Sequence, residues 1–143
     1  MYRWGFNLFP AYRGTGGRVL YIASDWREVK IKLPHNWRTR NYVGTIFGGS
    51  IYGAIDPFYM LMLMRILGPD YTVWDKAAAI RFKRPGKTTL FADFDLSSDE
   101  IDEIKRLADT SKSIDRIYEV TLKDGEGVVH ARIEKTLYIA KKK

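Results

Sequence analysis

Hydrophobic residues are most concentrated between positions 41 and 67 of the chain. A polar, glycine-rich approach, NYVGTIFGGS, leads into a run that is apolar at nearly every position and ends at Leu67. A helix that is apolar on all sides, instead of along one stripe, is buried all round. Asp56-Pro57 and Arg65 interrupt the run, so it lacks the stretch of about 20 apolar residues that a membrane span needs. The pattern predicts the core helix of a soluble domain.

Strict alternation of apolar and polar positions predicts strands on both sides of this helix. Before it, Val29, Ile31 and Leu33 alternate with two lysines, which indicates one long strand or two bent ones over residues 18–33. After it, alternation predicts strands over residues 72–84, 88–96, 114–122 and 128–139. In the first of these we expect four side chains to share one face: Trp74, Ala78, Ile80 and Phe82.

Turn and cap signals separate the strands. Ser97-Ser98-Asp99-Glu100 has the order of a capping box and predicts a short, acidic, amphipathic helix over residues 97–110. Asp124-Gly125 predicts a hairpin between the last two strands. Glycines and Pro10 predict an N-terminal arm without regular structure over residues 1–17. The apolar side chains of this arm should pack over the core or a neighbouring subunit: Trp4, Phe6, Leu8 and Phe9.

The predicted order of elements is strand, buried helix and then four strands with one helix inserted. A long antiparallel sheet wrapped around a central buried helix is the economical way to bury that helix, which makes the fold class α+β. We expect a single domain over residues 1–143, with the arm and the inserted helix of residues 97–110 on its periphery. The edge strands of such a sheet favour a dimer with a shared sheet.

Composition narrows the possible chemistry. The chain has 143 residues, 45% of them hydrophobic, and no cysteine, which excludes disulfides, thiol nucleophiles and thiolate metal sites. The N-terminal residues lack the uninterrupted apolar stretch of a signal peptide, so we expect a cytoplasmic setting. A formal charge of +7 allows an anionic partner such as nucleic acid, acidic lipid or a phosphorylated cofactor, without choosing among them.

Two features of the central segment carry candidate chemistry. Gly48-Gly49 leaves the first backbone N–H groups of a helix uncovered, so that they can meet a ligand oxygen. Close packing of the helix against the sheet explains the glycine pair equally well. Asp56 is the only carboxylate in the apolar run, and it needs a partner, a cap or a catalytic role. Asp56-Pro57 also resembles an N-cap followed by proline, and spacing alone favours that cap.

No other nucleophile near this segment has the groups that would activate it. Ser50 has no histidine at a suitable spacing. His35 and His130 are too isolated for a metal site or a catalytic triad, and we expect His130 to point outward from its strand. The sequence therefore predicts no metal site, and a carboxylate is what remains for a hydrolytic reaction.

Two motifs resemble those of a known family. The stretch Asn41-x-x-Gly44-Thr45-x-Phe47-Gly48-Gly49, with Asp56 downstream, is similar to the Asn-x-x-Gly-x-x-His-Gly-Gly…Asp signature of hotdog-fold acyl-CoA thioesterases of the phenylacetate-pathway type. Phe82-Lys83-Arg84-Pro85-Gly86 resembles the Phe-x-Arg-Pro-Gly strand end of that family. The chain is closer still to the DUF4442 group, in which Phe-Gly-Gly replaces His-Gly-Gly. This likeness covers nearly all of residues 7–139 and implies a hotdog fold.

The resemblance implies a role for the central residues. Asp56 would act as general base on water or as nucleophile toward a thioester. The backbone N–H of Gly49, with that of Gly48, would polarise the thioester carbonyl as an oxyanion hole. Asn41 would hold the attacking water or the carbonyl. The alignment also implies one helix from about Gly48 to Leu67 that is kinked at Pro57.

The other motif residues are expected to bind the substrate: Thr45, Phe47, Gly48, Lys83 and Arg84. Phe47 stands where the related thioesterases have histidine, so an imidazole near the carbonyl is lost while the base is kept. The basic residues around Arg84 are either a solvated strand face or contacts for the phosphates of coenzyme A. Coenzyme A would enter as part of the substrate, with no further cofactor.

Three functions are open at this point. The first is an acyl-CoA thioesterase that forms a homodimer or a dimer of dimers, with no nucleic-acid or membrane partner. The second is a non-catalytic hotdog protein that binds acyl-CoA or a similar acyl ligand, favoured if Phe47 closes the site to water. The third is a nucleic-acid-binding module, suggested only by charge, since no known binding motif interleaves the aromatic and basic residues.

Overall fold

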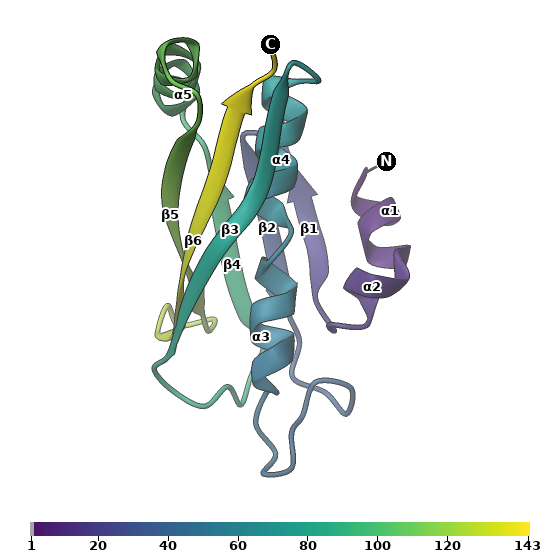
Figure 1. Cartoon of the computed structure of the whole chain (residues 1–143). Helices are drawn as coiled ribbons and strands as arrows, with labels where there is room; N and C mark the ends of the chain where they lie inside the picture. Colours follow the sequence, from purple (N-terminus) through teal and green to yellow (C-terminus); the bar gives the residue numbers. More distant parts are fainter. Residues whose placement is uncertain (1) are drawn as a thin grey trace.

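The fold is one antiparallel sheet that curves around a bent helix (Figure 1). The computed structural model describes residues 2–143, apart from the side chains of Tyr2 and Trp4. The predicted packing of Trp4 therefore lies outside the described part. The six strands lie in the order β1-β2-β4-β5-β6-β3. Their bounds are β1 Arg18–Ile22, β2 Glu28–Leu33, β3 Tyr71–Phe82, β4 Leu90–Asp95, β5 Ile114–Lys123 and β6 Val129–Lys141. The helices are α1 Tyr2–Leu8, α2 Pro10–Arg13, α3 Gly48–Ile55, α4 Phe58–Leu67 and α5 Ser98–Thr110.

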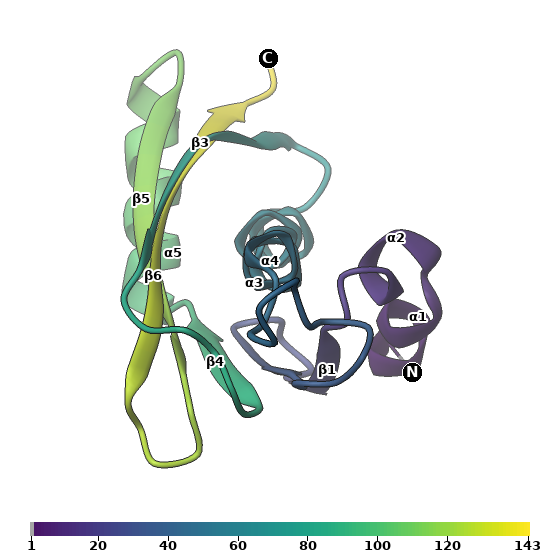
Figure 2. The same ribbon diagram turned by 90° about the horizontal axis from the view of Figure 1, so that it is seen from below.

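The sheet encloses α3 and α4 on its concave side, as Figure 2 shows from below. Phe58, Met62 and Leu63 on α4 are fully buried. The ring of Phe58 lies 5.1 Å from the ring of Phe94 on β4. Each such side chain contributes about 1.5–3 kcal/mol to the free energy of unfolding through burial of apolar surface. The predicted architecture, a long antiparallel sheet around a central buried helix, is confirmed.

The central helix bends at Pro57, where the family resemblance implies a kink. The backbone N–H of Asp56 still donates to the carbonyl of Tyr52 at 2.9 Å, and helical bonding resumes at the carbonyl of Pro57. Proline has no N–H, so the bond that it would make is missing and the axis kinks there. Residues Gly48–Leu67 are long and apolar enough to cross a membrane by length and composition alone. Half of that stretch is buried inside the protein, as for a core helix.

The prediction for one face of β3 is wrong at Trp74. The register between β3 and β6 shifts between Asp75 and Ala77, which is a bulge. Because side chains alternate with a period of two, one extra residue exchanges the faces on either side of it. Ala78, Ile80 and Phe82 share the inner face as expected. Trp74 lies on the outer face, where its ring stacks on Tyr138 of β6 at 4.3 Å.

The N-terminal arm has more regular structure than predicted. It forms two short helices, α1 and α2, and Pro10 stands at the first position of α2, where a missing N–H costs nothing. Phe6 packs on the core, with its ring 5.5 Å from that of Phe58. Leu8 and Phe9 are exposed. Gly5 lies inside α1, and Gly14 is the C-cap of α2.

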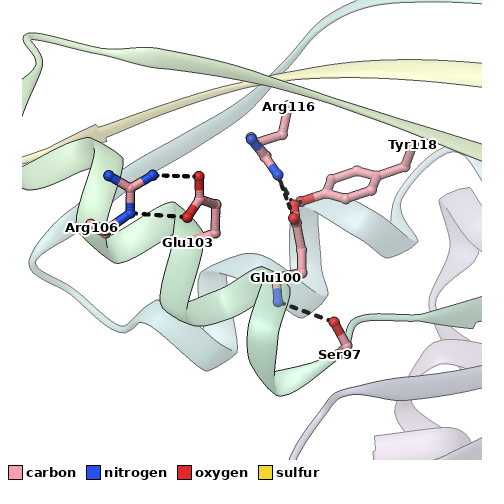
Figure 3. A network of polar contacts seen from close by, with 6 residues as sticks. All are labelled: Ser97, Glu100, Glu103, Arg106, Arg116 and Tyr118. Carbon is pink, nitrogen blue, oxygen red and sulfur yellow. Dashed lines mark hydrogen bonds and ion pairs between the residues drawn. The ribbon is translucent and has the colours of Figure 1, made fainter.

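Helix α5 begins as predicted, but only half of the capping box forms. The hydroxyl of Ser97 accepts a hydrogen bond from the backbone N–H of Glu100 at 3.0 Å. The Glu100 carboxylate does not return to Ser97; it accepts from Arg116 at 2.9 Å and from the Tyr118 hydroxyl at 2.6 Å (Figure 3). Burial, and then the contact with the Glu100 carboxylate, raise the pKa of Tyr118, and Arg116 partly opposes them. The network fixes α5 to β5.

The two edges of the sheet differ. At the β1 edge, the side chain of Asn7 on α1 accepts from the backbone N–H of Val19 at 2.7 Å and donates to its carbonyl at 3.1 Å. At the opposite edge, β6 pairs with one side of the twelve-residue strand β3, and no strand pairs with its other side within the described chain. Ala77, Ala78 and Ala79 on this strand are exposed. An uncovered edge of this length is a template for pairing with another chain.

Candidate active site

The start of α3 opens into a pocket at one end of the molecule. Figure 1 shows the loop before α3 and the loop between β3 and β4 at that same end. The backbone N–H of Ile46 donates to the carbonyl of Gly86 at 2.8 Å and joins the two loops. They enclose about 380 Å³. Five of the eight predicted site residues line this pocket: Asn41, Thr45, Gly48, Lys83 and Arg84.

The first two N–H groups of α3 are open. The N–H groups of Ser50 and Ile51 donate to the carbonyl of Phe47 at 3.0 and 3.1 Å. Those of Gly48 and Gly49 find no acceptor among the residues that the structure describes. These two donors and the positive end of the helix dipole suit an anion or a polarised carbonyl oxygen.

Aromatic rings explain why both positions are glycine. A Cβ at Gly49 would lie 2.5 Å from the ring of Phe47, and one at Gly48 would lie 3.3 Å from the ring of Phe82 on β3. Close packing against the sheet therefore applies at Gly48, and packing against Phe47 applies at Gly49. The open N–H groups exist in addition to this packing, so the two sequence-based explanations are compatible. Phe47 and Phe82 are both 57% exposed and border the open donors with apolar surface.

Asn41 organises the loop in front of the helix. Its side-chain oxygen accepts from the N–H groups of Val43 and Thr45, both at 3.0 Å, and its amide donates to the Thr45 hydroxyl at 2.8 Å. Gly44 supplies the positive φ of 86° that this turn needs. In this arrangement Asn41 acts on the loop, and its expected role of holding water or the carbonyl stays a prediction.

Asp56 is bound to a buried lysine. Its Oδ1 accepts a hydrogen bond from Lys135 Nζ at 2.7 Å and another from the Tyr52 hydroxyl at 2.9 Å. The side chain of Lys135 is 1% exposed, whereas that of Asp56 is 46% exposed. Helix α4 has no side-chain cap at its start. The alternative that Asp56 is an N-cap is therefore wrong; the carboxylate has a charged partner instead.

Lys135 contacts a second carboxylate. Its Nζ lies 3.0 Å from Oδ1 of Asp75 on β3, 3.1 Å from the carbonyl oxygen of Asp56 and 3.2 Å from the Tyr52 hydroxyl. An ammonium group has three donors. Asp56 and Tyr52 take all three, so the Asp75 oxygen is buried in an ion pair without a directed hydrogen bond.

Burial and charge act in opposite directions within this cluster. Burial of Lys135 lowers its pKa, but its contacts with Asp56, Asp75 and Tyr52 together outweigh burial and raise that pKa. Burial is also the largest influence on Asp75 and raises its pKa against the opposing effect of Lys135. Burial raises the pKa of Tyr52. At neutral pH the cluster therefore holds a charged lysine.

The sequence-based predictions missed Lys135, Tyr52 and Asp75. A signal for Lys135 exists in the strand pattern, because it occupies an inward position of β6 between Ile133 and Leu137. A lysine in that row must be paired with a buried carboxylate. No comparable signal exists for Asp75, because the bulge in β3 turns it inward.

The two candidate groups of the central helix are far apart within one chain. Gly49 and Asp56 are separated by seven helical residues, which is about 10 Å along the axis at about 1.5 Å per residue. Asp56 does not line the pocket at the helix start. One thioester cannot contact both groups of the same protomer.

His130 lies inside, which corrects the expectation that it points outward. It is 8% exposed, and its ring nitrogens contact the Asp124 carboxylate at 2.9 Å and the Pro85 carbonyl at 3.1 Å. The register of β5 and β6 shifts between Leu122 and Lys123, so alternation fails next to the hairpin. The hydrogen bond from His130, followed by backbone N–H groups, lowers the pKa of Asp124. Among the described residues, no group of three or more acidic or histidine side chains could hold a metal.

The protein-family comparison decides the family. The model of a domain of unknown function, DUF4442, matches residues 2–139. The chain belongs to the DUF4442 family. A comparison with curated proteins finds no match.

Solved structures share the fold. A Pseudomonas aeruginosa protein of unknown function, described as a probable thioesterase, is 18% identical with a TM-score of 0.84, over 97% of this chain and 93% of that one. A thioesterase from Haemophilus influenzae is 13% identical with a TM-score of 0.69, over 96% and 87% of the two chains. A mutant thioesterase from Pseudomonas aeruginosa is 11% identical with a TM-score of 0.65, over 89% and 83%. This DUF4442 protein therefore has the hotdog fold.

Proposed function

We propose that this protein hydrolyses acyl-CoA thioesters, with Asp56 as general base and the N–H groups at the start of α3 as the oxyanion hole. One observation carries the proposal: a single helix presents two open donors, at Gly48 and Gly49, and a half-exposed carboxylate with one free oxygen. A fold shared with proteins described as thioesterases supports it. The chain has no cysteine, so a thiol acyl-enzyme route is excluded.

The proposed reaction needs only these groups and water. Oδ2 of Asp56 accepts a proton from a water molecule while the water oxygen bonds to the carbonyl carbon of the thioester. The carbonyl oxygen gains negative charge, which the N–H groups of Gly48 and Gly49 stabilise. The C–S bond then breaks, sulfur leaves with the electron pair and takes the proton from Asp56, and the products are a carboxylic acid and a thiol.

The separation of about 10 Å within one helix requires a second copy of the chain. An attacking water lies about 3 Å from its base and from the carbonyl carbon, so both groups must converge on one small volume. We propose that the β3 edges of two protomers pair, so that Gly49 of one faces Asp56 of the other. The exposed Ala77 to Ala79 stretch on the open edge supports this pairing. A homodimer, or a dimer of such dimers, is then the active form.

Coenzyme A suits the pocket at the start of α3. Lys83 and Arg84 are exposed, line the pocket and form no ion pair within the described part of the chain. Two unpaired cations beside a helix N-terminus favour phosphate groups. Acyl-CoA is a cytoplasmic metabolite class, in keeping with the setting expected from the sequence.

The second candidate function is binding of an acyl ligand without turnover. The Phe47 ring over Gly49, together with the ion pair that engages Asp56, favours it. Hydrolysis assays over a range of acyl-CoA chain lengths, with Asp56→Asn measured in parallel, separate the two functions. Turnover in the native protein and its loss in Asp56→Asn, with acyl-CoA binding retained in both, supports the thioesterase. Binding without turnover in the native protein favours the binding function.

A further inference from the structure

A buried lysine reaches Asp56 from the far end of the chain. Lys135 is 79 residues away in sequence and lies on the inner face of β6, where its neighbours Ile133 and Leu137 are fully buried. Burying an ammonium group costs several kcal/mol unless charge and hydrogen bonds compensate it. An apolar residue of similar volume would satisfy packing at this position equally well. Packing alone therefore does not account for a lysine here.

The contacts of this lysine fix which oxygen of Asp56 is free. Lys135 Nζ and the Tyr52 hydroxyl both donate to Oδ1. Oδ2 receives no hydrogen bond from the residues that the structure describes, and the Asp56 side chain is 46% exposed. The carboxylate is thus held by one oxygen and presents the other. A general base held in this way has one defined orientation toward its water.

The charges around Asp56 come from three elements. Tyr52 faces it from α3, Lys135 from β6, and Asp75 from β3 through the shared lysine. Lys135 is the cation between the two carboxylates. It contacts both, so it ties Asp56 on the helix to Asp75 on the sheet.

We propose that Lys135 is a positioning residue for Asp56, an inference that rests on the proposed function: with Tyr52 it holds Oδ1 and turns Oδ2 toward the substrate. Lys135 does not touch substrate itself. It acts through orientation.

The main test is the double variant Lys135→Met/Asp75→Asn, which removes the cation and the second carboxylate together, so that no buried charge is left unpaired. We expect kcat to fall about 10- to 100-fold with little change in KM, because a misoriented base affects the chemical step. Lys135→Arg keeps a charged donor at this position, so kcat should fall less than in the double variant.

A matched control is Lys30→Met. Lys30 on β2 forms an exposed ion pair with Asp93 at 3.4 Å, away from the β3 edge, and its loss should leave kcat unchanged. Tyr52→Phe removes one of the two hydrogen bonds to Oδ1, so it should lower kcat by less than the double variant does. If the Lys135 double variant keeps the native kcat while Asp56→Asn is inactive, Lys135 is structural and the proposal is overturned.

The assays separate the positioning role from the proposed use of Asp56. If Asp56→Asn hydrolyses thioesters at the native rate, the proposed use of Asp56 as base fails. If Asp56→Asn is inactive and the double variant, still folded, keeps the native kcat and KM, only the positioning role of Lys135 fails.

Discussion

The two ends of helix α3 handle polar groups in opposite ways. At its start, Gly48 and Gly49 offer backbone N–H groups that nothing in the described chain occupies. At its end, the Asp56 carboxylate is held by Tyr52 and by a lysine from β6. An exposed N–H group can be hydrated when no ligand is bound. A partly buried carboxylate is less well hydrated and is stabilised by a hydrogen-bonded or charged partner. The first end is a binding site made of local backbone, and the second is a site made by tertiary contacts.

The largest expected effect comes from a substitution of Asp56, at the end of α3. Asp56→Asn keeps the size of the side chain and removes its basic oxygen, so kcat should fall by a factor of about 10² to 10⁴ while acyl-CoA binding is retained. Steady-state assays and calorimetric binding measure the two effects. Asp109→Asn, at an exposed ion pair with Lys141, is the control and should behave like the native protein. Native turnover in Asp56→Asn contradicts the carboxylate mechanism.

The second prediction concerns a variant that separates the two protomers. It would also separate the two ends of α3 that are proposed to form one site. Ala77→Lys/Ala79→Lys places lysines on the open β3 edge. In a symmetric antiparallel pair the edge meets its own copy, so these charges would repel one another. We expect a monomer by analytical ultracentrifugation and a loss of kcat of about 10²-fold or more, because the base would be misplaced.

Thr136→Lys, on an interior strand, controls for added charge on the outer face. It should leave the oligomer and kcat unchanged. Two results would contradict the proposed dimer: a native protein that is monomeric at micromolar concentration, or full activity in monomeric Ala77→Lys/Ala79→Lys. Either one would show that the two ends of α3 do not need a second protomer.

The third prediction concerns Gly49, at the start of α3. Gly49→Ala places a Cβ 2.5 Å from the Phe47 ring, so the ring must move over the open N–H groups. We expect kcat to fall by about 10- to 100-fold, less than the full loss of an oxyanion-hole donor. Gly5→Ala on α1 is the control, since a Cβ there meets nothing within 4 Å.

Mixing the two defects sharpens the comparison. Asp56→Asn and Gly49→Val protomers, refolded together, would form heterodimers in which one site is intact and the other carries both changes. A random mixture should recover about a quarter of native activity if the ends of two protomers share a site. No recovery in a mixture that forms heterodimers contradicts the shared site.

The smallest expected effect concerns stability against pH. The pKa of Lys135 is raised in the folded protein above its ordinary value of 10.5. Its contribution to the free energy of unfolding is therefore complete below about that pH and is lost as the pH rises through the folded value. Urea unfolding between pH 8 and pH 11.5 should show this alkaline loss in the native protein, and a weaker loss in Lys135→Met/Asp75→Asn. Equal slopes for both proteins would mean that the cluster does not stabilise the charged lysine.

Local patterns predicted most of the fold. The buried helix, the alternating strand β4, the Ser97 cap and the β5–β6 hairpin all depend on residues close in sequence. The bend at Pro57 was expected only from the family resemblance, because local spacing favoured an N-cap at Asp56. The predicted facing direction of a side chain was wrong where an extra residue interrupts the alternation of a strand. This happened at Trp74 in β3 and at His130 beside the hairpin. A single bulge shifts the inward and outward alternation by one residue, and the position of the bulge depends on the partner strand.

The sequence by itself determined the open end of the candidate site, because two glycines after Phe47 at a helix start leave N–H groups free in any fold that contains this helix. It also excluded thiol chemistry and left Asp56 as the carboxylate of the apolar segment. Only the tertiary structure decided what Asp56 binds. Lys135 reaches it because β6 lies beside the helix and the bulge in β3 brings Asp75 to the same ammonium group. Charge pairs between residues far apart in sequence depend on strand order and register, which local periodicity does not encode.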